Sequence, residues 1–517
     1  MTQLPAFSFP ELRACLQAAD LLVEALHVPA EFTGTIDLQV DSRRISRGSW
    51  FLAYRGEKVD SHQFLNSQVL SQLGGVIYED EASTAILQAH SLPALRVKDS
   101  RKAWAYIAAA RYGHPENDLR IIGVTGTNGK TSTVWVIKEM LAELRIPCLS
   151  IGTLGAMFPE EVIDIGHTTP DPEQLFRLLA EARRRGVFYV VMEVSSHAIA
   201  QKRLGPIQFS AAAFTSFSRD HLDFHHSMEE YFAEKWRFIT EFLRPQARVL
   251  IARHVLDALQ NYGQGQNCPS SALIYRSASQ QVNVESKQAS FRFLQRNLYD
   301  AQIEIDDGES RRQGSVCFVT EHGAENFLAG LLLVESLSEK KLLPESWMNV
   351  RAVPGRLEAV RTQQTDEPIV FVDYAHTPDA IERTLQTLRG LTDKQVWIVF
   401  GCGGDRDPGK RPLMAKAAAA IADRIVITSD NPRSEDPQHI IEDILQGLDG
   451  SAVDYTDVNR RQAIYWVVQQ AEPGDVILIA GKGHETYQLI GNRTEDFDDR
   501  LVAKEALLLR QQGLGRS

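Results

Sequence analysis

The sequence has few cysteines and no excess of basic residues, and each absence excludes a class of protein. Its five cysteines, among 517 residues, show neither a CxxC spacing nor a histidine spacing, which argues against a disulfide framework and against structural zinc. The formal net charge of -12, without a basic block that carries interleaved aromatics, argues against a nucleic-acid surface. We therefore expect reduced thiols and small-molecule partners, with no nucleic acid among them.

Long apolar runs are also missing. No run is long enough to span a bilayer, and the amino terminus has no basic region followed by an apolar run and a small-residue cleavage site. We therefore expect a cytoplasmic protein that does not bind a membrane. Separately, we expect it to be a monomer. The 44% hydrophobic and 24% charged content is typical of a soluble globular protein, and the length predicts about three domains.

The most informative stretch is Ile121-Ile-Gly-Val-Thr-Gly-Thr-Asn-Gly-Lys-Thr-Ser132, an apolar strand that leads into a glycine-rich turn and then an apolar-periodic helix. Backbone N–H groups of such a turn bind an anion together with the positive end of the helix, while Lys130 supplies a charge and Thr131 a hydroxyl for a metal. The stretch predicts a triphosphate site, although Val124 stands where the usual spacing has its first glycine. A purely structural strand–helix turn is the alternative.

Residues before about Tyr112 are predicted to form a unit of their own, with a helix from Glu11 to Leu26 and short β-type runs at 48–54 and 75–78. No catalytic constellation stands out there on spacing grounds. The short run Val40-Asp-Ser-Arg43 fits a polar turn or part of a ligand site, and the residues alone favour the turn.

From about residue 118 to residue 345 the chain alternates strands and helices, which predicts a parallel sheet covered on both faces. Ligands of such sheets gather at the carboxyl ends of the strands. Polar clusters stand where that rule would put them, at His167-Thr-Thr-Pro170, Glu193-Val-Ser-Ser-His197 and 218–225. Singly, Glu193 could be a capping carboxylate and His221 a loop histidine, but together they favour metal and substrate ligation.

Two further segments of this region have clear patterns. Residues 227–243 carry an apolar stripe at helical spacing and are predicted to form a core helix. Lys235 borders that stripe, and its spacing alone predicts a surface lysine whose stem lies along apolar side chains. Between Ser270 and Thr320, short alternating runs predict an antiparallel insertion that turns at Asp306-Asp-Gly308.

A second α/β unit is predicted after Val353-Pro-Gly-Arg356. Its apolar runs at 369–373, 395–400, 424–428 and 475–480 predict the strands of a doubly wound sheet. Polar residues follow each run, at 373–376, 405–407, 430–433 and 481–485, and four such ends on one rim would form a second ligand site. The glycines at 401–404 lack the third glycine of a dinucleotide fingerprint, so nicotinamide binding is rejected.

The sequence therefore predicts an α/β protein of three domains. They are a small α/β amino-terminal domain (1–112), a central parallel-sheet ATPase domain with the phosphate loop (113–348), and a carboxy-terminal doubly wound, Rossmann-like domain (349–517).

With these motifs the chain resembles the Mur ligases over essentially its whole length. Gly126-Thr-Asn-Gly-Lys-Thr131 looks like the family's own phosphate loop, which accounts for the valine at position 124. Tetrahydrofolate polyglutamate ligases share this loop and the last two domains. The runs Asp41-Ser-Arg43, His167-Thr-Thr169 and Asp430-Asn-Pro-Arg433 instead look like the Mur ligases that add the third residue of the peptidoglycan stem.

The resemblance implies an ATP-dependent amide ligation in the synthesis of peptidoglycan precursors for the cell wall. The γ-carboxylate of the D-glutamate in UDP-N-acetylmuramoyl-L-alanyl-D-glutamate attacks the γ-phosphate of ATP, and the amine of a diamino acid attacks the resulting acyl phosphate. No protein nucleophile is needed. The protein's task is then to neutralise charge and to position two anions.

The resemblance also implies roles for individual residues. Lys130 holds the phosphates, Thr131 and Glu193 bind one Mg²⁺, and His221 with Lys235 serves a second. An ammonium cannot bind a cation, and the family resolves this by carbamylating the lysine that matches Lys235. The implied ATP-binding positions are Gly126, Thr127, Asn128, Gly129, Lys130, Thr131, Ser132, Asn326, Arg356, Asp373 and His376. One departure is Ala329, where many relatives have a second asparagine.

Two more sets are implied in the same way. The positions for the UDP-muramyl dipeptide are Val40, Ser42, Glu57, Lys58, Val59, Thr168, Thr169, Ser195, Gln201 and Arg203. Those for the incoming amino acid are Arg406, Asp430, Asn431, Pro432, Arg433, Gly481 and Glu485. An arginine fork can bind the distal carboxylate of meso-diaminopimelate through two hydrogen bonds, whereas lysine offers no carboxylate there. Diaminopimelate is therefore favoured over L-lysine or another amino acid, and a ligase over a non-catalytic NTP-dependent switch.

Overall fold

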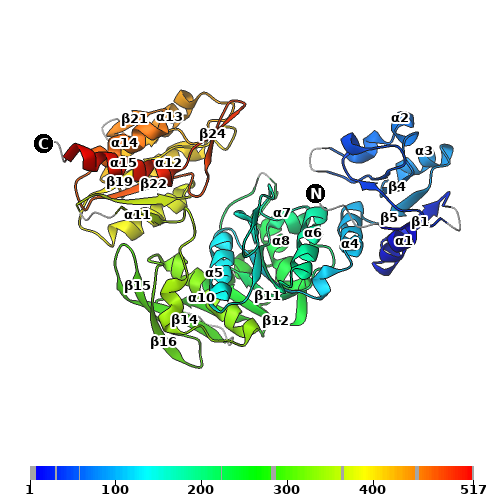
Figure 1. The fold of residues 1–517 in the computed structure, drawn as a ribbon, viewed down its shortest axis with the longest axis horizontal. Coiled ribbons are helices and arrows are strands. Elements are labelled where there is room, and N and C mark those ends of the chain that lie inside the picture. The colour runs from blue at the N-terminus through cyan, green and yellow to red at the C-terminus, as the bar shows by residue number, and fades with distance from the viewer. Residues whose placement is uncertain are drawn as a thin grey trace. The chain divides into compact units, whose positions relative to one another are not determined.

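The computed structural model describes residues 7–28, 32–56, 59–222, 224–280, 287–362, 366–448 and 453–514. The chain forms two compact units, whose elements are labelled in Figure 1. The first unit contains residues 1–276, 280–289 and 329–342, and the second contains residues 277–279, 290–328 and 343–517. The division into three domains stays a prediction.

The first unit begins with a five-stranded sheet in the order β1-β5-β4-β3-β2, in which only β1 is antiparallel to its neighbour. Its strands are β1 (Leu22–Leu26), β2 (Leu38–Gln39), β3 (Trp50–Leu52), β4 (Gly75–Tyr78) and β5 (Ala94–Val97). Helices α1 (Phe9–Ala18) and α4 (Ser100–Arg111) pack on one face. The side chains of α2 (Ser67–Leu70) and α3 (Thr84–Ala89) pack on the other. Short 3-10 turns are η1 (Ser42–Arg44), η2 (Ser61–Phe64), η3 (Glu81–Ser83) and η4 (Pro115–Asn117).

The predicted helix from Glu11 to Leu26 is wrong in its second half. Ser8 and Glu11 form a capping box that starts α1, but the helix ends at Ala18 and residues 22–26 form β1. Leu22 pairs with Val97 and Leu26 with Ala94, so the ladder with β5 outweighs the local helical pattern.

The first unit continues with a sheet whose strand β6 leads into the phosphate loop. Strands β13, β12, β11, β6, β10 and β7 are parallel in that order, and β8 and β9 extend the sheet antiparallel, which confirms the predicted parallel sheet. The strands are β6 (Arg120–Thr125), β7 (Cys148–Gly152), β8 (Gly155–Met157), β9 (Val162–Ile163), β10 (Tyr189–Glu193), β11 (Phe209–Phe214), β12 (Leu243–Ala252) and β13 (Leu273–Ser277). The helices are α5 (Lys130–Glu143), α6 (Pro172–Arg184), α7 (Ser196–Ala200), α8 (Met228–Glu241) and α9 (Arg253–Tyr262).

The glycine that precedes Val124 has a packing role. Gly123 lies inside β6, and a Cβ there would come within 2.3 Å of Phe238 and 2.8 Å of Phe209. These two rings meet edge to face at 4.9 Å between centroids. Gly123 therefore lets α8 approach the sheet, and it is not part of the loop.

The second unit contains the predicted antiparallel insertion, made of β14 (Gln288–Arg296), β15 (Ala301–Asp306) and β16 (Arg311–Val316). The turn falls at 307–310 and overlaps the predicted 306–308, and Asp307 accepts hydrogen bonds there from the backbone of Glu309 and Ser310. Helix α10 (Glu321–Ser338) follows, with residues 321–328 in this unit and residues 329–338 in the first, and the turn η5 (Pro344–Asn349) comes next.

The rest of the second unit is a doubly wound sheet in the order β17-β18-β22-β19-β20-β21, parallel except for the edge strand β17. The strands are β17 (Glu358–Val360), β18 (Ile369–Asp373), β19 (Val396–Phe400), β20 (Arg424–Thr428), β21 (Tyr455–Asp457) and β22 (Val476–Ala480), with a hairpin of β23 (Tyr487–Ile490) and β24 (Arg493–Asp496). Helices α11 (Pro378–Arg389), α12 (Lys410–Ala419) and α13 (Pro437–Leu445) cover one face. Helices α14 (Arg460–Gln470) and α15 (Asp499–Leu514) cover the other. The α/β fold class is confirmed.

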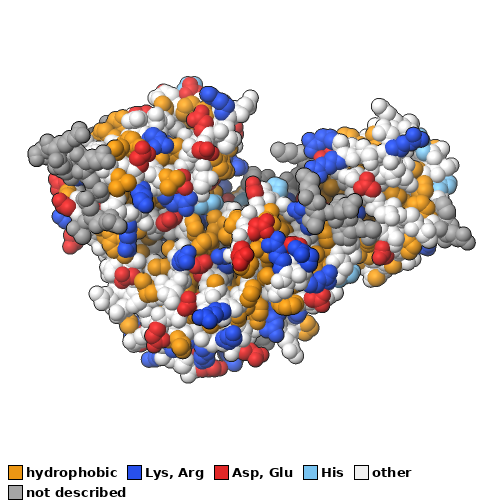
Figure 2. Space-filling view, viewed as in Figure 1, with side chains coloured by type: hydrophobic (Ala, Val, Ile, Leu, Met, Phe, Trp, Pro, Cys, Tyr) orange, Lys and Arg blue, Asp and Glu red, His pale blue; other side chains and the backbone are white. Residues whose placement is uncertain are grey.

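Several expectations from composition can be compared with the structure. The five cysteines are present as thiols and not as disulfides. No helix among the described residues is long and apolar enough to cross a membrane. Figure 2 shows acidic and basic side chains intermingled on the visible face.

Candidate functional site

The phosphate loop connects β6 to α5. The residues that follow β11 form hydrogen bonds with it. Gly126 has φ +147°, and a Cβ there would lie 2.2 Å from the hydroxyl of Thr215, so only glycine fits. The Thr215 hydroxyl donates to the carbonyl of Asn128 at 2.6 Å, and the Asn128 amide donates to the Ser216 hydroxyl at 2.7 Å. Gly129, at φ +85°, caps α5 just before Lys130. The loop is thus a preformed turn at a helix amino terminus, the geometry that binds phosphates.

Two lysine amines converge on this loop. Lys130 Nζ donates to the carbonyls of Gly126 and Thr127, at 2.8 Å each. Lys235 Nζ, from α8, donates to the same Gly126 carbonyl at 2.9 Å. The prediction of a surface lysine at position 235 is wrong, because its side chain is only 1% exposed. The turn of α8 that carries Lys235 packs beneath the loop, which spacing along one helix does not show.

The surroundings of Lys235 disfavour a charge. Burial, and then the nearby Lys130 cation, lower the pKa of Lys235 well below its usual value, and Asp220 opposes them. The Lys235 amine also lies over the ring of Tyr231, 4.9 Å from its centroid. Lys235 therefore lies next to the phosphate loop in surroundings that favour loss of its proton.

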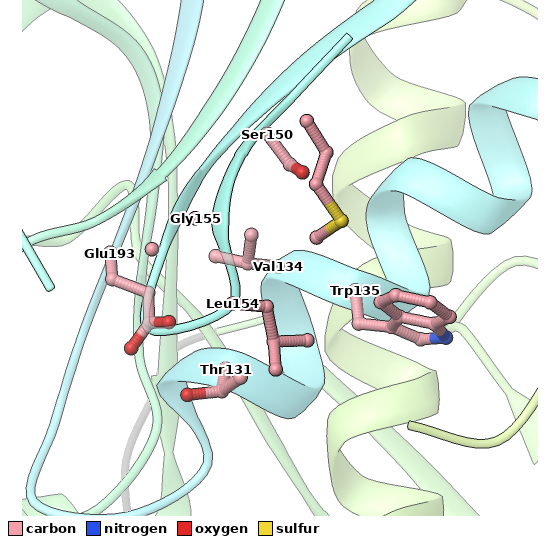
Figure 3. A pocket seen from close by; sticks show the side chains of 9 residues that line it. Thr131, Val134, Trp135, Ser150, Leu154, Gly155 and Glu193 are labelled. Carbon is pink, nitrogen blue, oxygen red and sulfur yellow. The ribbon is translucent and has the colours of Figure 1, made fainter. Parts of the chain in front are cut away.

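Glu193 is the second buried group beside the loop. It is the last residue of β10 and pairs in register with Val124 of β6, so the parallel ladder places its carboxylate next to the loop. Its Oε1 accepts a hydrogen bond from the Thr153 amide at 2.7 Å, and its side chain also hydrogen-bonds Thr131. Burial raises the pKa of Glu193, while Lys130 and these hydrogen bonds oppose the rise. In Figure 3 the Thr131 hydroxyl points toward the Glu193 carboxylate, at a cavity that both residues line.

The donor atoms beside the loop fit a magnesium ion. Mg²⁺ prefers hard oxygen ligands and usually takes one or two protein groups together with substrate phosphates and water. The Thr131 hydroxyl and the Glu193 carboxylate supply such oxygens at the end of the phosphate loop. Among the described residues, no group of three or more His, Cys, Asp or Glu side chains gathers as a self-contained metal site.

His221 lies near the ring of Tyr231. Its ring centroid is 4.9 Å from that of His197 and 6.0 Å from that of Tyr231, the ring that also lies under the Lys235 amine. Its backbone has φ +51°, and its Nε2 lies 3.5 Å from Asp220 Oδ2. His221 and Lys235 therefore lie around one aromatic ring near the loop.

Four residues of the predicted dipeptide set form one connected network. The Thr169 hydroxyl donates to the Glu193 carbonyl at 2.8 Å and to the Ser195 hydroxyl at 3.3 Å. Arg203 donates to the Thr169 carbonyl at 2.6 Å and to Gln201 Oε1 at 2.9 Å. Thr168 lies 3.2 Å from the Thr153 hydroxyl. The network is therefore continuous with the phosphate loop through Glu193.

The predicted nucleotide-binding residues lie in the amino-terminal sheet region. Val40 packs at the edge of its core, and Ser42 starts η1, where Asp41 caps the turn by accepting from the Arg43 amide at 3.0 Å. The polar turn expected from the residues is thus present. Val59 is exposed, and Glu57 and Lys58 lie outside the described residues.

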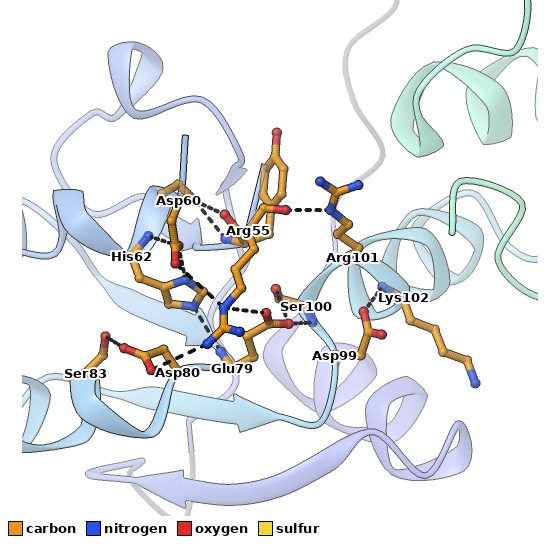
Figure 4. Close-up of polar contacts among 12 residues, drawn as sticks. Arg55, Asp60, His62, Glu79, Asp80, Ser83, Asp99, Ser100, Arg101 and Lys102 are labelled. Atoms are coloured by element: carbon orange, nitrogen blue, oxygen red, sulfur yellow. Dashed lines mark hydrogen bonds and ion pairs between the residues drawn. The ribbon is translucent and has the colours of Figure 1, made fainter. Parts of the chain in front are cut away.

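A polar cavity of about 300 Å³ lies close to these residues along the chain. It is lined by Arg55, Glu79, Lys98, Asp99, Arg101 and Lys202. Figure 4 shows Arg55 among Asp60, Glu79 and Asp80, while Arg101 donates to the Arg55 carbonyl at 2.6 Å. Four cations and two carboxylates line the cavity, and Asp20, Asp60 and Asp80 also pair with the lining cations Lys98 and Arg55.

In the second unit, the predicted polar rim forms as expected, because β18, β22, β19 and β20 are parallel and end at one edge. Asp430 and Asn431 are buried after β20, and the Gly481 amide donates to the Asp373 carbonyl at 3.1 Å. Arg433 follows Pro432 with φ +52°, and its Nη1 donates to the Gly404 carbonyl at 2.7 Å. Arg406 is exposed.

The predicted adenosine-side residues have mixed surroundings. Asp373 is buried, accepting backbone hydrogen bonds from Leu357 at 2.6 Å and Ala375 at 2.7 Å, and burial raises its pKa against the effect of Arg356. The Arg356 guanidinium lies 4.7 Å from the ring centroid of Tyr374, and its buried Nε has no hydrogen-bond partner among the described residues. His376 is exposed, and Asn326 is buried on α10.

Sequence reasoning missed several residues that the structure places in these networks. Thr153 contacts Glu193, and Tyr231 contacts Lys235. Nothing in the sequence spacing of Thr153 and Tyr231 predicts these contacts. Lys482 is fully buried beside Asn431 and Glu485. Its position between two glycines after a strand was an available signal.

Comparisons with known proteins agree with this architecture. Residues 124–334 match the family model of the Mur ligase middle domain, and residues 355–483 match that of the Mur ligase glutamate ligase domain. The UDP-N-acetylmuramoyl-L-alanyl-D-glutamate–2,6-diaminopimelate ligase of Geobacillus thermodenitrificans is 37% identical over 92% of this chain and 95% of its own. The protein of the same name from Synechococcus sp. strain WH7803 is 38% identical over 96% of this chain and 98% of its own. A solved structure of a ligase with that name is 29% identical, with a TM-score of 0.67 over 98% of this chain and 99% of that one.

Proposed function

Because the chain belongs to the Mur ligase family, we propose that it joins meso-diaminopimelate to UDP-N-acetylmuramoyl-L-alanyl-D-glutamate with hydrolysis of ATP to ADP. The relatives at 37% and 38% identity carry names that state this acceptor and this nucleotide. The product is a UDP-muramyl tripeptide for peptidoglycan synthesis. The protein acts as a cytoplasmic monomer on small-molecule substrates.

One observation carries the proposal. Glu193 contacts the phosphate loop through its side chain, which hydrogen-bonds Thr131, and contacts the dipeptide network through its carbonyl, which accepts from Thr169. Because Glu193 contacts both the phosphate loop and the dipeptide network, it supports a reaction between a substrate carboxylate and the γ-phosphate of ATP. A pure NTP switch would need no such link.

The reaction has two steps. A γ-carboxylate oxygen of the D-glutamate forms a bond to the γ-phosphorus while the bond to ADP breaks. The amine of the acceptor then forms a bond to the acyl carbon, the phosphate leaves with the bonding electrons, and the nitrogen loses a proton. Lys130 and the loop amides neutralise the phosphates, and the Thr169 network orients the carboxylate.

The magnesium ions supply positive charge that offsets the repulsion between the two anions. Thr131 and Glu193 would hold one ion, and His221 with Lys235 would serve the other. A protonated lysine cannot do this. The lowered pKa of the buried Lys235 amine supports carbamylation, in which the neutral nitrogen bonds to the carbon of CO2 and loses a proton, which leaves an anionic carbamate.

The remaining sets have separate tasks. The nucleotide end of the substrate is assigned to Val40, Ser42 and residues 57–59. Arg356, Asp373, His376 and Asn326 serve the adenosine side. Arg406, Asp430 to Arg433, Gly481 and Glu485 hold the acceptor, and the arginines favour a second carboxylate over the ammonium of lysine.

A ligation assay with diaminopimelate and L-lysine side by side tests the proposal. Tripeptide product and phosphate release should require ATP, the dipeptide nucleotide and diaminopimelate together. Equal use of lysine would contradict the acceptor assignment. Phosphate release without any acceptor, and no product in any combination, would favour the switch instead.

A further inference from the structure

Lys482 is the most deeply buried cation at the rim of the second unit. It lies in the loop after β22 and is 0% exposed. Its ammonium donates to Asn431 Oδ1 and to Glu485 Oε2, both at 3.1 Å. It also faces the Tyr487 ring, 5.6 Å from the centroid. Burying a lysine is costly unless acceptors surround it, so this arrangement needs an explanation.

The contacts of Lys482 fix the orientation of the Asn431 amide. Asn431 Oδ1 accepts from Lys482 and from the Leu489 amide at 3.0 Å, and two donors on one atom identify that atom as the oxygen. The Nδ2 group then donates to Glu485 Oε2 at 2.8 Å. One N–H of this amide has a partner in this network, and the second remains available to a ligand.

The same contacts fix Glu485. Lys482 and Asn431 both contact Oε2, and no described residue hydrogen-bonds Oε1. The network therefore leaves one carboxylate oxygen of Glu485 and one amide N–H of Asn431 without a partner among the described residues. An α-amino-acid group needs this pair, since its ammonium donates and its carboxylate accepts.

We propose that Lys482 is a positioning residue for the amino-acid acceptor, which holds Asn431 and Glu485 so that they receive an α-amino-acid group. The inference rests on the proposed function, because it takes the rim to be the acceptor site. Lys482 does not touch the acceptor. It balances the charge of Glu485 and keeps the carboxylate from turning away.

The test varies each substrate in turn with Lys482→Met, which keeps the length of the side chain and removes its charge. The Michaelis constant for diaminopimelate should rise about thirtyfold or more, since a buried carboxylate loses its partner. The kcat and the Michaelis constants for ATP and the dipeptide nucleotide should change less than about threefold. A folded variant with an unchanged constant for diaminopimelate, or with all constants changed together, would overturn the proposal.

Asp475→Asn is the matched structural control. Asp475 is buried just before β22, at the opposite end of the strand from Lys482, and accepts from the Trp397 indole at 3.1 Å. Its neutral replacement should lower the melting temperature and leave the Michaelis constant for diaminopimelate unchanged. A selective rise of that constant in this control would show that general loosening of the sheet produces the effect.

A double variant covers the case in which Lys482→Met does not fold. Lys482→Met with Glu485→Gln buries no unpaired charge, and the Leu489 amide still orients Asn431. If Lys482 acts through Glu485, the double variant should match Glu485→Gln within about threefold in every constant. A further rise of more than about tenfold over Glu485→Gln would overturn the proposal.

The proposed function and the role of Lys482 can be contradicted separately. A wild-type protein that makes no tripeptide contradicts the proposed function and with it the role of Lys482. A wild-type protein that makes tripeptide, with a Lys482→Met variant of normal affinity for diaminopimelate, contradicts only the role of Lys482.

Discussion

Lys235 and Lys482 are buried to nearly the same degree, at 1% and 0% exposed, and have opposite surroundings. Lys235 donates to a carbonyl and has the Lys130 cation nearby, which helps to lower its pKa. Lys482 forms an ion pair with Glu485 at 3.1 Å. Burial removes water from both amines, but among the described residues only Lys482 has a carboxylate within ion-pair distance. The partner, and not the burial, decides what a buried lysine can do.

The difference suits two tasks. A lysine with a lowered pKa loses its proton more readily and then acts as a nucleophile, and modification of Lys235 to an anion would place a negative group near Lys130, where a cation is disfavoured. An ion-paired ammonium is inert but holds its acceptors in place, which is the task proposed for Lys482.

Removal of the cation next to Lys235 should have the largest effect. Lys130→Ala deletes the main phosphate charge from the loop but little core volume, so ligation should fall by about a thousandfold or more in kcat. Circular dichroism and the melting temperature should stay close to the wild type. Near-normal turnover in the folded variant would contradict the phosphate-loop assignment.

Lys235→Ala should also be nearly inactive, with kcat lower by about a hundredfold or more. Added formate, acetate or propionate should restore part of the activity, because a short carboxylate can occupy the place of the carbamate. Lys482→Met is the comparison variant, and the same anions should not rescue it.

Mass analysis of the wild-type protein at saturating bicarbonate completes this test. A mass increase that maps to Lys235 supports the carbamate. Only free lysine at that position, together with an active Lys235→Ala variant, would remove the modification from the mechanism.

On the rim, Arg433→Ala should raise the Michaelis constant for diaminopimelate by roughly a hundredfold, as expected for a lost charge-assisted contact. The constants for ATP and the dipeptide nucleotide should move little. Part of the effect will come from the loop itself, since Arg433 also donates to the Gly404 carbonyl. Arg424→Ala is the control, because its exposed pair with Asp454 should contribute only about 0–1 kcal/mol. If the Michaelis constants for all substrates change by only a few-fold, the assignment of Arg433 is contradicted.

The sequence predicts those parts of this molecule that depend on local pattern. The strand, turn and helix at 120–143 and the four parallel strands of the carboxy-terminal sheet follow from apolar periodicity and glycine placement, and they form as predicted. Glu193 could be placed near the loop because polar residues at the carboxyl ends of neighbouring parallel strands meet at one edge.

What the sequence does not show depends on contacts between distant elements. Lys235 reads as a surface lysine along α8, and only the packing of that helix beneath the loop buries it. Residues 22–26 read as helix, and only the pairing with β5 makes them a strand. Lys482 stands next to predicted ligands in the chain, but its role depends on Asn431, which is 51 residues away.

The smallest effect, and the most direct test of the comparison, is on stability. Lys235 has a lowered pKa in the folded protein, so between that pKa and the usual value of 10.5 the unfolded chain binds the extra proton. Stability therefore rises with pH across this window, and at neutral pH the buried amine reduces it. In buffer free of CO2 and magnesium, Lys235→Met should melt at or a few degrees above the wild type at pH 7, and the gain should shrink as the pH approaches 10.5. Lys482→Met should melt a few degrees lower, because it leaves the Glu485 carboxylate unpaired. Scanning calorimetry at several pH values measures the melting temperatures of both variants. An equal fall in melting temperature for Lys235→Met and Lys482→Met at pH 7 would contradict the proposed difference between the two buried lysines.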